Sequence, residues 1–181
     1  MDNQLIRYWS TPVTVNANTN TIDGLGLVFF DGSDGTKHQF KPGKYEALAP
    51  GAEIVKHRGD VVCCFNHDMA NILGRESNGT LKLSQTIRGY AYETKLNPDD
   101  NQHASIGAKV KRGDVPGSSA IFKPLAGSWK DGILQYTKIL LVEIGPVTSP
   151  AMTGTINHSE GFDSISDAIY ETQRRISQFS K

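Results

Sequence analysis

One apolar run constrains the fold more than any other feature of the chain. Residues 61–65 (VVCCF) are apolar without alternation, and this pattern predicts a short strand that is covered on both faces. The run leads directly into Asn66-His67-Asp68. A histidine at the end of a buried strand is held rigidly and can still face a cleft. The sequence therefore predicts a strand-rich domain in which His67 has a special position.

The overall composition agrees with a strand-rich domain. A length of 181 residues suits one domain with a real hydrophobic core. The 18 glycines and the apolar content of 38% favour many strands and turns over a helical bundle. The 19 basic and 19 acidic side chains cancel, so there is no electrostatic basis for a nucleic-acid or membrane partner. The sequence also shows neither a secretory signal nor an apolar run of the roughly 18 residues that a membrane-spanning helix needs.

Further along the chain, apolar segments separated by turn residues predict the remaining strands. Residues 45–48 are predicted as a helical turn, and residues 98–110 as a short helix that ends near Gly113. Asp131-Gly132 is a turn signal. The predicted strands are residues 6–15, 24–30, 61–65, 80–83, 87–92, 119–122, 133–136 and 139–144.

The C-terminal region differs in kind from the rest. Residues 163–179 carry apolar side chains near helical spacing with charged side chains opposite, which predicts an amphipathic helix. Such a helix packs either on its own domain or on another subunit.

The two cysteines, Cys63 and Cys64, are adjacent within the apolar run. Neighbouring residues of a strand point to opposite faces, so these two are not expected to form a disulfide with each other. We expect small buried hydrophobic side chains rather than reactive thiols.

Among the five histidines, His67 alone follows a buried strand. His38 and His57 lie among charged or turn residues and are expected at the surface, while His103 and His158 lie in polar stretches. By itself, His67 is either a hydrogen-bonded structural histidine at a strand end or a catalytic base.

A serine pair and one glutamate could complete a catalytic set with His67. Ser118 and Ser119 precede an apolar segment and, taken alone, are no more than a turn leading into a strand. Glu143 is the only acidic residue in the apolar residues 139–147. Because an unpaired buried carboxylate is costly, Glu143 either faces solvent on an edge strand or has a partner such as a histidine. A histidine, a serine and a carboxylate on separate strands are the parts of a serine hydrolase.

Four sequence blocks, in order along the chain, carry a family resemblance. They are residues 40–45 (FKPGKY), 65–75 (FNHDMANILGR), 111–122 (KRGDVPGSSAIF) and 141–151 (LVEIGPVTSPA). In these blocks the chain resembles the prohead maturation proteases of tailed phages, which are similar in fold to the herpesvirus assemblins. The resemblance covers roughly residues 24–155.

The resemblance implies roles for three side chains. His67 matches the general base, and Ser119 matches the nucleophile because Phe122 then falls on the closing phenylalanine of the family motif. Glu143 falls where the member that orients the imidazole is expected.

Other positions near these three are alternatives or departures. Ser118 is the alternative nucleophile, and the resemblance makes the backbone amides of Ala151 and Met152 candidate oxyanion donors. The chain departs from the motif at Ile121, where the family has glycine, and at Gly145, where it has serine.

The resemblance further implies an α+β fold of mostly antiparallel strands, with a small closed β-barrel flanked by helices. It implies one domain over residues 1–181, with a core at about 24–155 and the C-terminal helix at about 163–179. That helix is a candidate contact in a homo-oligomer such as a dimer. No cofactor and no metal are implied.

In function, the resemblance implies a serine endopeptidase that processes extensions of the major capsid protein and of scaffold, and itself, inside the assembling prohead in the host cytoplasm. Two other hypotheses stay open. One is an inactive homologue that serves as an internal scaffold or assembly protein, and the other is a small-ligand-binding β-barrel without chemistry.

Overall fold

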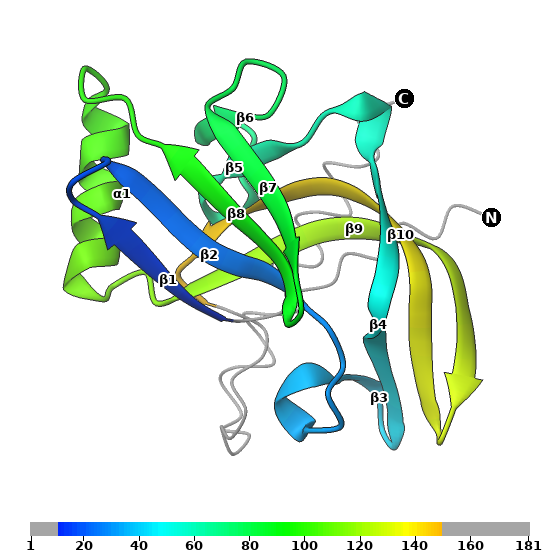
Figure 1. Ribbon diagram of the computed structural model, residues 1–181. Helices are drawn as coiled ribbons and strands as arrows, with labels where there is room; N and C mark the ends of the chain where they lie inside the picture. Colours follow the sequence, from blue (N-terminus) through cyan, green and yellow to red (C-terminus); the bar gives the residue numbers. More distant parts are fainter. Residues whose placement is uncertain (1–10, 150–181) are drawn as a thin grey trace.

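The computed structural model describes residues 11–149 and shows a strand-rich arrangement (Figure 1). Three 3₁₀ turns, Asp34–Thr36, His57–Gly59 and Phe65–His67, interrupt the strands, and α1 is Asn101–Arg112. The strands are β1 (Thr11–Asn16), β2 (Thr21–Val28), β3 (His38–Lys41), β4 (Lys44–Lys56), β5 (Val62–Cys64), β6 (Ile72–Arg75), β7 (Leu81–Thr86), β8 (Gly89–Lys95), β9 (Gly117–Lys130) and β10 (Ile133–Val147).

The described strands form one ten-stranded sheet. Its order is β3-β4-β10-β9-β1-β2-β8-β7, with β5 paired to β10 and β6 paired to β5. Neighbours are antiparallel except that β10 runs parallel to both β4 and β5. The prediction of a mostly antiparallel β fold is confirmed, and β10 is the strand around which the site is built.

The expected closed barrel is wrong. In the described part of the chain, β3 and β7 end the strand path without pairing with each other. Where β6 approaches β8, the contact is a side-chain hydrogen bond from Thr94 Oγ1 to the Leu73 carbonyl at 3.1 Å rather than a backbone ladder. Closure needs continuous pairing around the barrel, so the sheet is open and folds over on itself.

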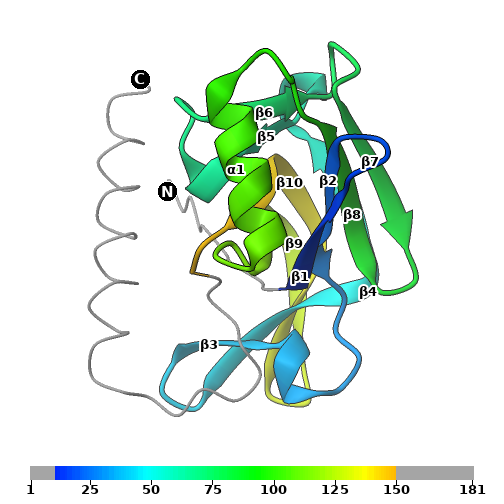
Figure 2. The same ribbon diagram turned by 90° about the vertical axis from the view of Figure 1, so that its left-hand side faces the viewer.

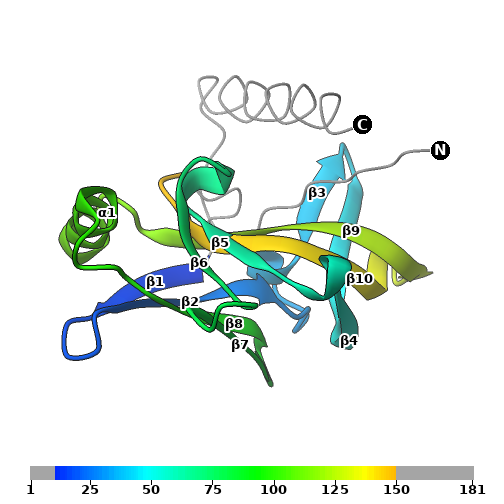
Figure 3. The same cartoon turned by 90° about the horizontal axis from the view of Figure 1, so that it is seen from above.

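The hydrophobic core lies between the two halves of this folded sheet. Figure 3 shows β1, β2, β8 and β7 on one side of β9 and β10. Gly26 permits this close approach, because a Cβ atom on it would lie 2.2 Å from Ile144 Cγ1. The largest buried apolar side chains are Ile22, Leu27, Leu48, Leu73, Leu81, Phe122, Ile139, Leu141 and Ile144.

The helix α1 is capped at both ends as its sequence requires. Asp100 accepts hydrogen bonds from the amides of Gln102 (2.8 Å) and His103 (3.4 Å), and Gly113 ends the helix with φ 91°. Figure 2 shows α1 standing beside β1. The helix predicted to end near Gly113 is confirmed, but it is the only α-helix among residues 11–149, so the expected flanking by several helices is not seen there.

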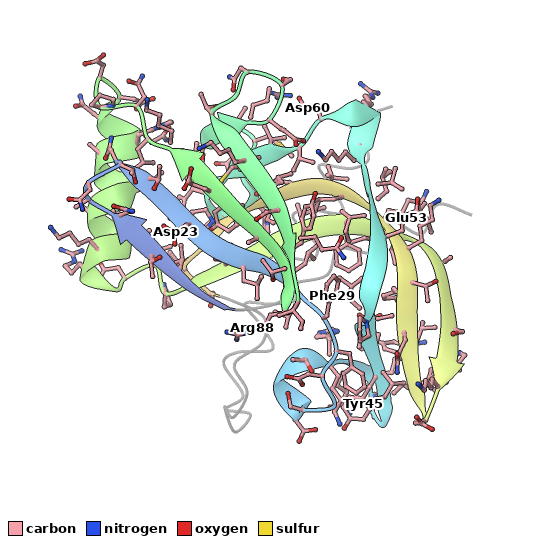
Figure 4. The ribbon with its side chains drawn as sticks, in the orientation of Figure 1. Asp23, Phe29, Tyr45, Glu53, Asp60 and Arg88 are labelled. Atoms are coloured by element: carbon pink, nitrogen blue, oxygen red, sulfur yellow. The ribbon has the colours of Figure 1, made fainter. Side chains whose placement is uncertain are left out.

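Other differences from the predictions lie in the long strands. Residues 45–48 are part of β4 and not a helical turn, because they pair with β10 from Tyr45↔Ile133 onward. Figure 4 shows Tyr45 near the β3–β4 hairpin, where Lys37 Nζ lies 4.6 Å from the centre of its ring. The two strands predicted at 133–136 and 139–144 are the single strand β10, which contains irregularities. The turn at Asp131-Gly132 is confirmed by left-handed φ values of 51° and 76°.

The predicted amphipathic helix at residues 163–179 lies outside the described residues. Within residues 11–149 there is no helix with the length and apolar character needed to cross a membrane.

Candidate active site

His67 reaches its place through a turn rather than along its strand. β5 runs parallel to β10 with Val62 opposite Glu143 and Cys63 opposite Ile144. After Cys64 the chain enters the 3₁₀ turn Phe65–His67, in which Asn66 and His67 have left-handed φ values of 53° and 58°. The turn brings the buried imidazole of His67 back to Glu143, whose Oε2 accepts a hydrogen bond from His67 Nδ1.

A loop contact also holds β5 in register. Figure 4 labels Asp60, which lies just before β5. Its carboxylate accepts from Arg75 Nη1 at 2.6 Å and from the Ser77 amide at 3.0 Å. These bonds join the residue before β5 to the end of β6 and to the turn after it. The strand that leads to His67 is therefore held by β10 on one side and by β6 on the other.

Glu143 faces the site because β10 has a bulge at Val142. The strand partners shift from Leu141↔Phe122 to Glu143↔Ile121, which leaves Val142 as the extra residue. Without this bulge Glu143 would share the core face of Leu141, two residues before it. With it, Leu141 and Glu143 point to opposite faces, and both are fully buried.

The carboxylate of Glu143 is held by two donors. Its Oε1 accepts from the Cys64 amide at 3.1 Å, and its Oε2 accepts from His67 Nδ1. Because a carboxylate only accepts, Nδ1 carries the proton, and the neutral imidazole has its accepting lone pair on Nε2. The sequence left two alternatives for Glu143, exposure to solvent or a partner such as a histidine. Glu143 is buried and has the histidine partner.

Ser119 shares a face with Glu143. Ser119 pairs with Gly145 and Ile121 pairs with Glu143 across the two strands. Directly paired residues share a face, as do residues two apart in a strand. Ser119 Oγ is buried and has no hydrogen-bond partner among the described residues, which is unusual for a buried hydroxyl.

The chain that carries His67 crosses this same face. A Cβ atom on Gly145 would lie 2.2 Å from the Cys64 carbonyl oxygen. The position beside Ser119 is therefore filled by the backbone that leads into the Phe65–His67 turn. The structure thus joins His67 to Glu143 and places Ser119 on the face over which this turn begins.

Ser118 points to the opposite side of β9. Its Oγ lies 3.0 Å from the hydroxyl of Tyr92 on β8, and both side chains are buried. A Cβ atom on Gly24 of β2 would lie 2.1 Å from Ser118 Oγ. Ser118 therefore lies in the core between the sheet halves, away from Glu143.

Comparison with known families places the chain. Residues 10–167 match the model of the caudovirus prohead serine protease family. The chain belongs to that family. No curated protein matches the chain, and no solved structure matches it either. The chemistry of a serine protease needs a serine, a histidine and a carboxylate, and here the His67–Glu143 pair and Ser119 are the corresponding side chains, with Ser119 and Glu143 on one strand face.

The departure from the family motif at Gly145 has a structural reason. A serine side chain at this position would meet the Cys64 backbone, from which even a Cβ atom would be only 2.2 Å away. Glycine allows the Cys64 backbone, at the end of β5, to lie close against β10 here. No comparable constraint is seen at Ile121, which is partly buried opposite Glu143.

The two cysteines are not competing nucleophiles. Both are buried, and burial followed by the charge of Glu143 raises the pKa of each thiol well above its usual value. The thiolate, which is the reactive form, is therefore disfavoured. The prediction of buried, unpaired cysteines is confirmed.

His38, which was expected at the surface, is partly buried, and His103, which lies in a polar stretch of the sequence, is buried. His103 is buried, where its Nδ1 accepts from the Asn97 amide at 2.9 Å and its Nε2 lies 2.9 Å from the Ile72 carbonyl. His38 Nδ1 lies 3.1 Å from Oε1 of the fully buried Glu46. Most of each side chain is buried. The partners that accompany this burial are not revealed by the flanking sequence.

Asp68 and Asn66 flank His67 and do different things. Asp68 Oδ1 accepts from the Ala70 amide at 2.9 Å, so it caps the following turn. Asn66 instead reaches Thr148 at the end of β10, a contact that sequence reasoning missed. Ala151 and Met152, the candidates for oxyanion donors, lie outside the described residues.

Proposed function

We propose that this chain is an active serine endopeptidase of tailed-phage prohead maturation, with Ser119 as nucleophile, His67 as general base and Glu143 as the group that orients the imidazole. Its substrates are extensions of the major capsid protein and of scaffold, and the chain itself. It acts inside the assembling prohead in the host cytoplasm. The observation that carries the proposal is the buried His67–Glu143 pair on the same face as the buried Ser119 hydroxyl.

The proposed reaction follows from the proton positions. Ser119 Oγ attacks the scissile carbonyl carbon while its proton moves to His67 Nε2, and the Glu143 carboxylate stabilises the imidazolium. The tetrahedral intermediate collapses as the amide C–N bond breaks, and the departing amine takes the proton from Nε2. Water then attacks the acyl-enzyme ester, again through His67, and releases the second product and Ser119.

Ser119 is favoured over Ser118 as the nucleophile by the faces of β9. Ser118 is engaged with Tyr92 in the core, whereas the Ser119 hydroxyl lies on the face of Glu143. Neither an internal scaffold nor a ligand-binding domain requires this arrangement.

The test combines a covalent probe with the natural reaction. Purified chain is treated with a fluorophosphonate, and the modified residue is located by mass spectrometry. In parallel, the chain is co-expressed with the major capsid protein and scaffold of its phage, and cleavage is followed on gels. We expect modification of Ser119 and processing in the parent, and neither in Ser119→Ala or His67→Ala.

Ser118→Ala is the matched control, because it removes a neighbouring hydroxyl on the other face and should leave labelling and processing in place. Loss of both in Ser118→Ala with retention in Ser119→Ala would reverse the assignment. A folded parent that neither reacts nor cleaves would support the inactive assembly protein instead.

A further inference from the structure

The turn that carries His67 needs something to hold it. If the chain continued from Cys64 in the parallel register of β5 with β10, residue 67 would lie beside Thr148. That position is five residues past Glu143, or about 16 Å along the strand. His67 Nδ1 instead contacts Glu143. The chain therefore reverses between Cys64 and His67.

The reversal depends on two consecutive left-handed residues. Asn66 has φ 53° and ψ 33°, and His67 has φ 58°. Outside glycine this conformation costs about 1–2 kcal/mol per residue, and asparagine is among the residues that adopt it most readily. One backbone hydrogen bond, from the Asp68 amide to the Phe65 carbonyl at 3.1 Å, closes the turn.

A second contact ties the turn to β10. Asn66 Oδ1 accepts from the Thr148 amide at 2.8 Å and lies 3.1 Å from the Thr148 hydroxyl. Thr148 follows directly after β10, and the last paired residue of that strand is Val147, opposite Gly117. The Thr148 amide lies beyond the paired parts of β5 and β9. It therefore donates to the Asn66 carboxamide and not to a neighbouring strand.

We infer that Asn66 is a positioning residue, which holds the left-handed turn against the end of β10 and so aims the His67 imidazole at Glu143. We call the hydrogen bonds of Asn66 Oδ1 with Thr148 the clamp. The inference rests on the proposed function only for its effect on catalysis, since the clamp and the His67–Glu143 contact are both features of the fold. Asn66 and Thr148 are exposed, so their bond contributes little to global stability. Its loss should act on the alignment of His67.

The chain contains a matched control. Asn78 Oδ1 accepts from the Thr80 amide at 3.1 Å and from the Thr80 hydroxyl at 2.6 Å. This is the same pair of contacts, between the same two residue types, in the turn that leads into β7. Asn78→Ala therefore removes the same two hydrogen bonds from a local turn elsewhere in the fold.

Three substitutions at position 66 separate the clamp from the backbone preference. Asn66→Gly keeps the left-handed conformation and loses the clamp, whereas Asn66→Ala loses both. Asn66→Asp keeps an acceptor oxygen and tolerance of the left-handed region. For each variant we would measure the rate of Ser119 modification by a fluorophosphonate, kcat and KM on a capsid-derived peptide, and urea unfolding.

We expect Asn66→Gly and Asn66→Ala to lower the modification rate and kcat by about 10-fold or more, since small misplacements of reacting groups carry costs up to about 100-fold. KM should change little. Asn66→Asp should remain within a few-fold of the parent, and Asn78→Ala should keep the parent rates. A parent-like rate in Asn66→Gly, or an equal loss in Asn78→Ala, would overturn the inference.

A measurement without catalysis keeps the two proposals distinguishable. The Nδ1 proton of His67, donated to a carboxylate, should give a strongly downfield NMR signal in the parent and in Asn78→Ala. In Asn66→Gly it should broaden or disappear at the same temperature and pH. An unchanged signal in Asn66→Gly contradicts the positioning role even if the chain proves inactive, whereas absence of Ser119 modification in the parent counts against the proposed function alone.

Discussion

Ser119 and Glu143 lie on one face of the β9–β10 pair. Ser119 is paired with Gly145 and Glu143 is paired with Ile121, so the two side chains are diagonal neighbours, two residues apart along the strands. This relationship exists because the Val142 bulge turns Glu143 away from the core face of Leu141. The serine that precedes Ser119 points the other way, to Tyr92. The two faces of the β9–β10 pair therefore differ. One carries Ser119 and Glu143 of the proposed catalytic site, and the other carries Ser118 and packs against the core.

The carboxylate of Glu143 should matter through the proton on His67. In Glu143→Gln, the amide oxygen can keep the Cys64 hydrogen bond, and the amide NH₂ then faces Nδ1. This favours the tautomer with its proton on Nε2, which cannot act as a base. We expect fluorophosphonate modification of Ser119 to slow by about 10²-fold or more, but not to vanish as in Ser119→Ala.

The control for this substitution is Glu93→Gln, which removes a half-exposed carboxylate paired with Lys82 at 3.0 Å on the neighbouring strand β7. It should leave the modification rate at the parent value. A parent-like rate in Glu143→Gln would remove Glu143 from the site.

Gly145 should resist even the smallest side chain. In Gly145→Ala the new methyl group would lie 2.2 Å from the Cys64 carbonyl oxygen, a backbone atom that can move only with β5. Overpacking of this kind typically costs about 1–3 kcal/mol. We expect the urea midpoint to fall accordingly and Ser119 modification to slow, because β5 leads into the His67 turn.

Gly35→Ala serves as its comparison, because a Cβ atom there meets nothing closer than Ser33 Oγ at 4.0 Å. Its free energy of unfolding should stay within about 0.5 kcal/mol of the parent. Equal stability of the two alanine variants would show that β5 adjusts without cost.

The buried pair Ser118–Tyr92 should behave as a coupled unit. Ser118→Ala or Tyr92→Phe alone leaves one buried hydroxyl without its partner, at a cost of about 1–3 kcal/mol each. Since the double variant leaves no such group, its loss of stability should be smaller than the sum of the single losses. Urea unfolding of the four proteins measures this coupling, and strict additivity would show that the bond contributes nothing.

Asp31 should make stability depend on pH in the acid range. Hydrogen bonds from the Ser33 side chain and amide, and from the Thr36 hydroxyl, lower the pKa of Asp31 to about 2. A lowered pKa means that the fold favours the ionised carboxyl. The resulting stabilisation is complete above the usual pKa of 3.8 and is lost as pH falls from there towards 2.

We therefore expect Asp31→Asn to melt at a lower temperature than the parent at pH 5 to 7. The difference should shrink between pH 4 and pH 2, within the range in which both proteins still unfold cooperatively. A melting-temperature difference that stays constant over this range would contradict the ionic origin of the stabilisation.

Local signals explain the parts of the fold that the sequence predicted well. The apolar residues 61–65 contain β5, Asp100 and Gly113 cap α1, and Asp131-Gly132 forms the tight turn before β10. Each of these depends on residues that are neighbours in the chain. Residues 45–48 were predicted wrongly because their strand conformation comes from pairing with β10, which is distant in sequence.

The candidate site divides in the same way. Motif order singled out His67, Ser119 and Glu143, and the apolar surroundings of Glu143 required either solvent or a partner. Nothing local indicated the contact between Asn66 and Thr148, which are far apart in sequence. The contact of His103 with the Ile72 carbonyl was missed for the same reason, whereas His38 meets Glu46 across the β3–β4 hairpin.

The sequence by itself determined the family, the short strands with their turns, and which side chains are able to carry the chemistry. The tertiary structure alone decided that the sheet stays open, that Val142 bulges, and that the chain reverses at Asn66 and His67. A strand's alternation predicts faces only while its register is unbroken, and one extra residue exchanges them. Bulges and left-handed turns are fixed by distant partners, so the direction in which Glu143 and His67 point is a property of the assembled sheet.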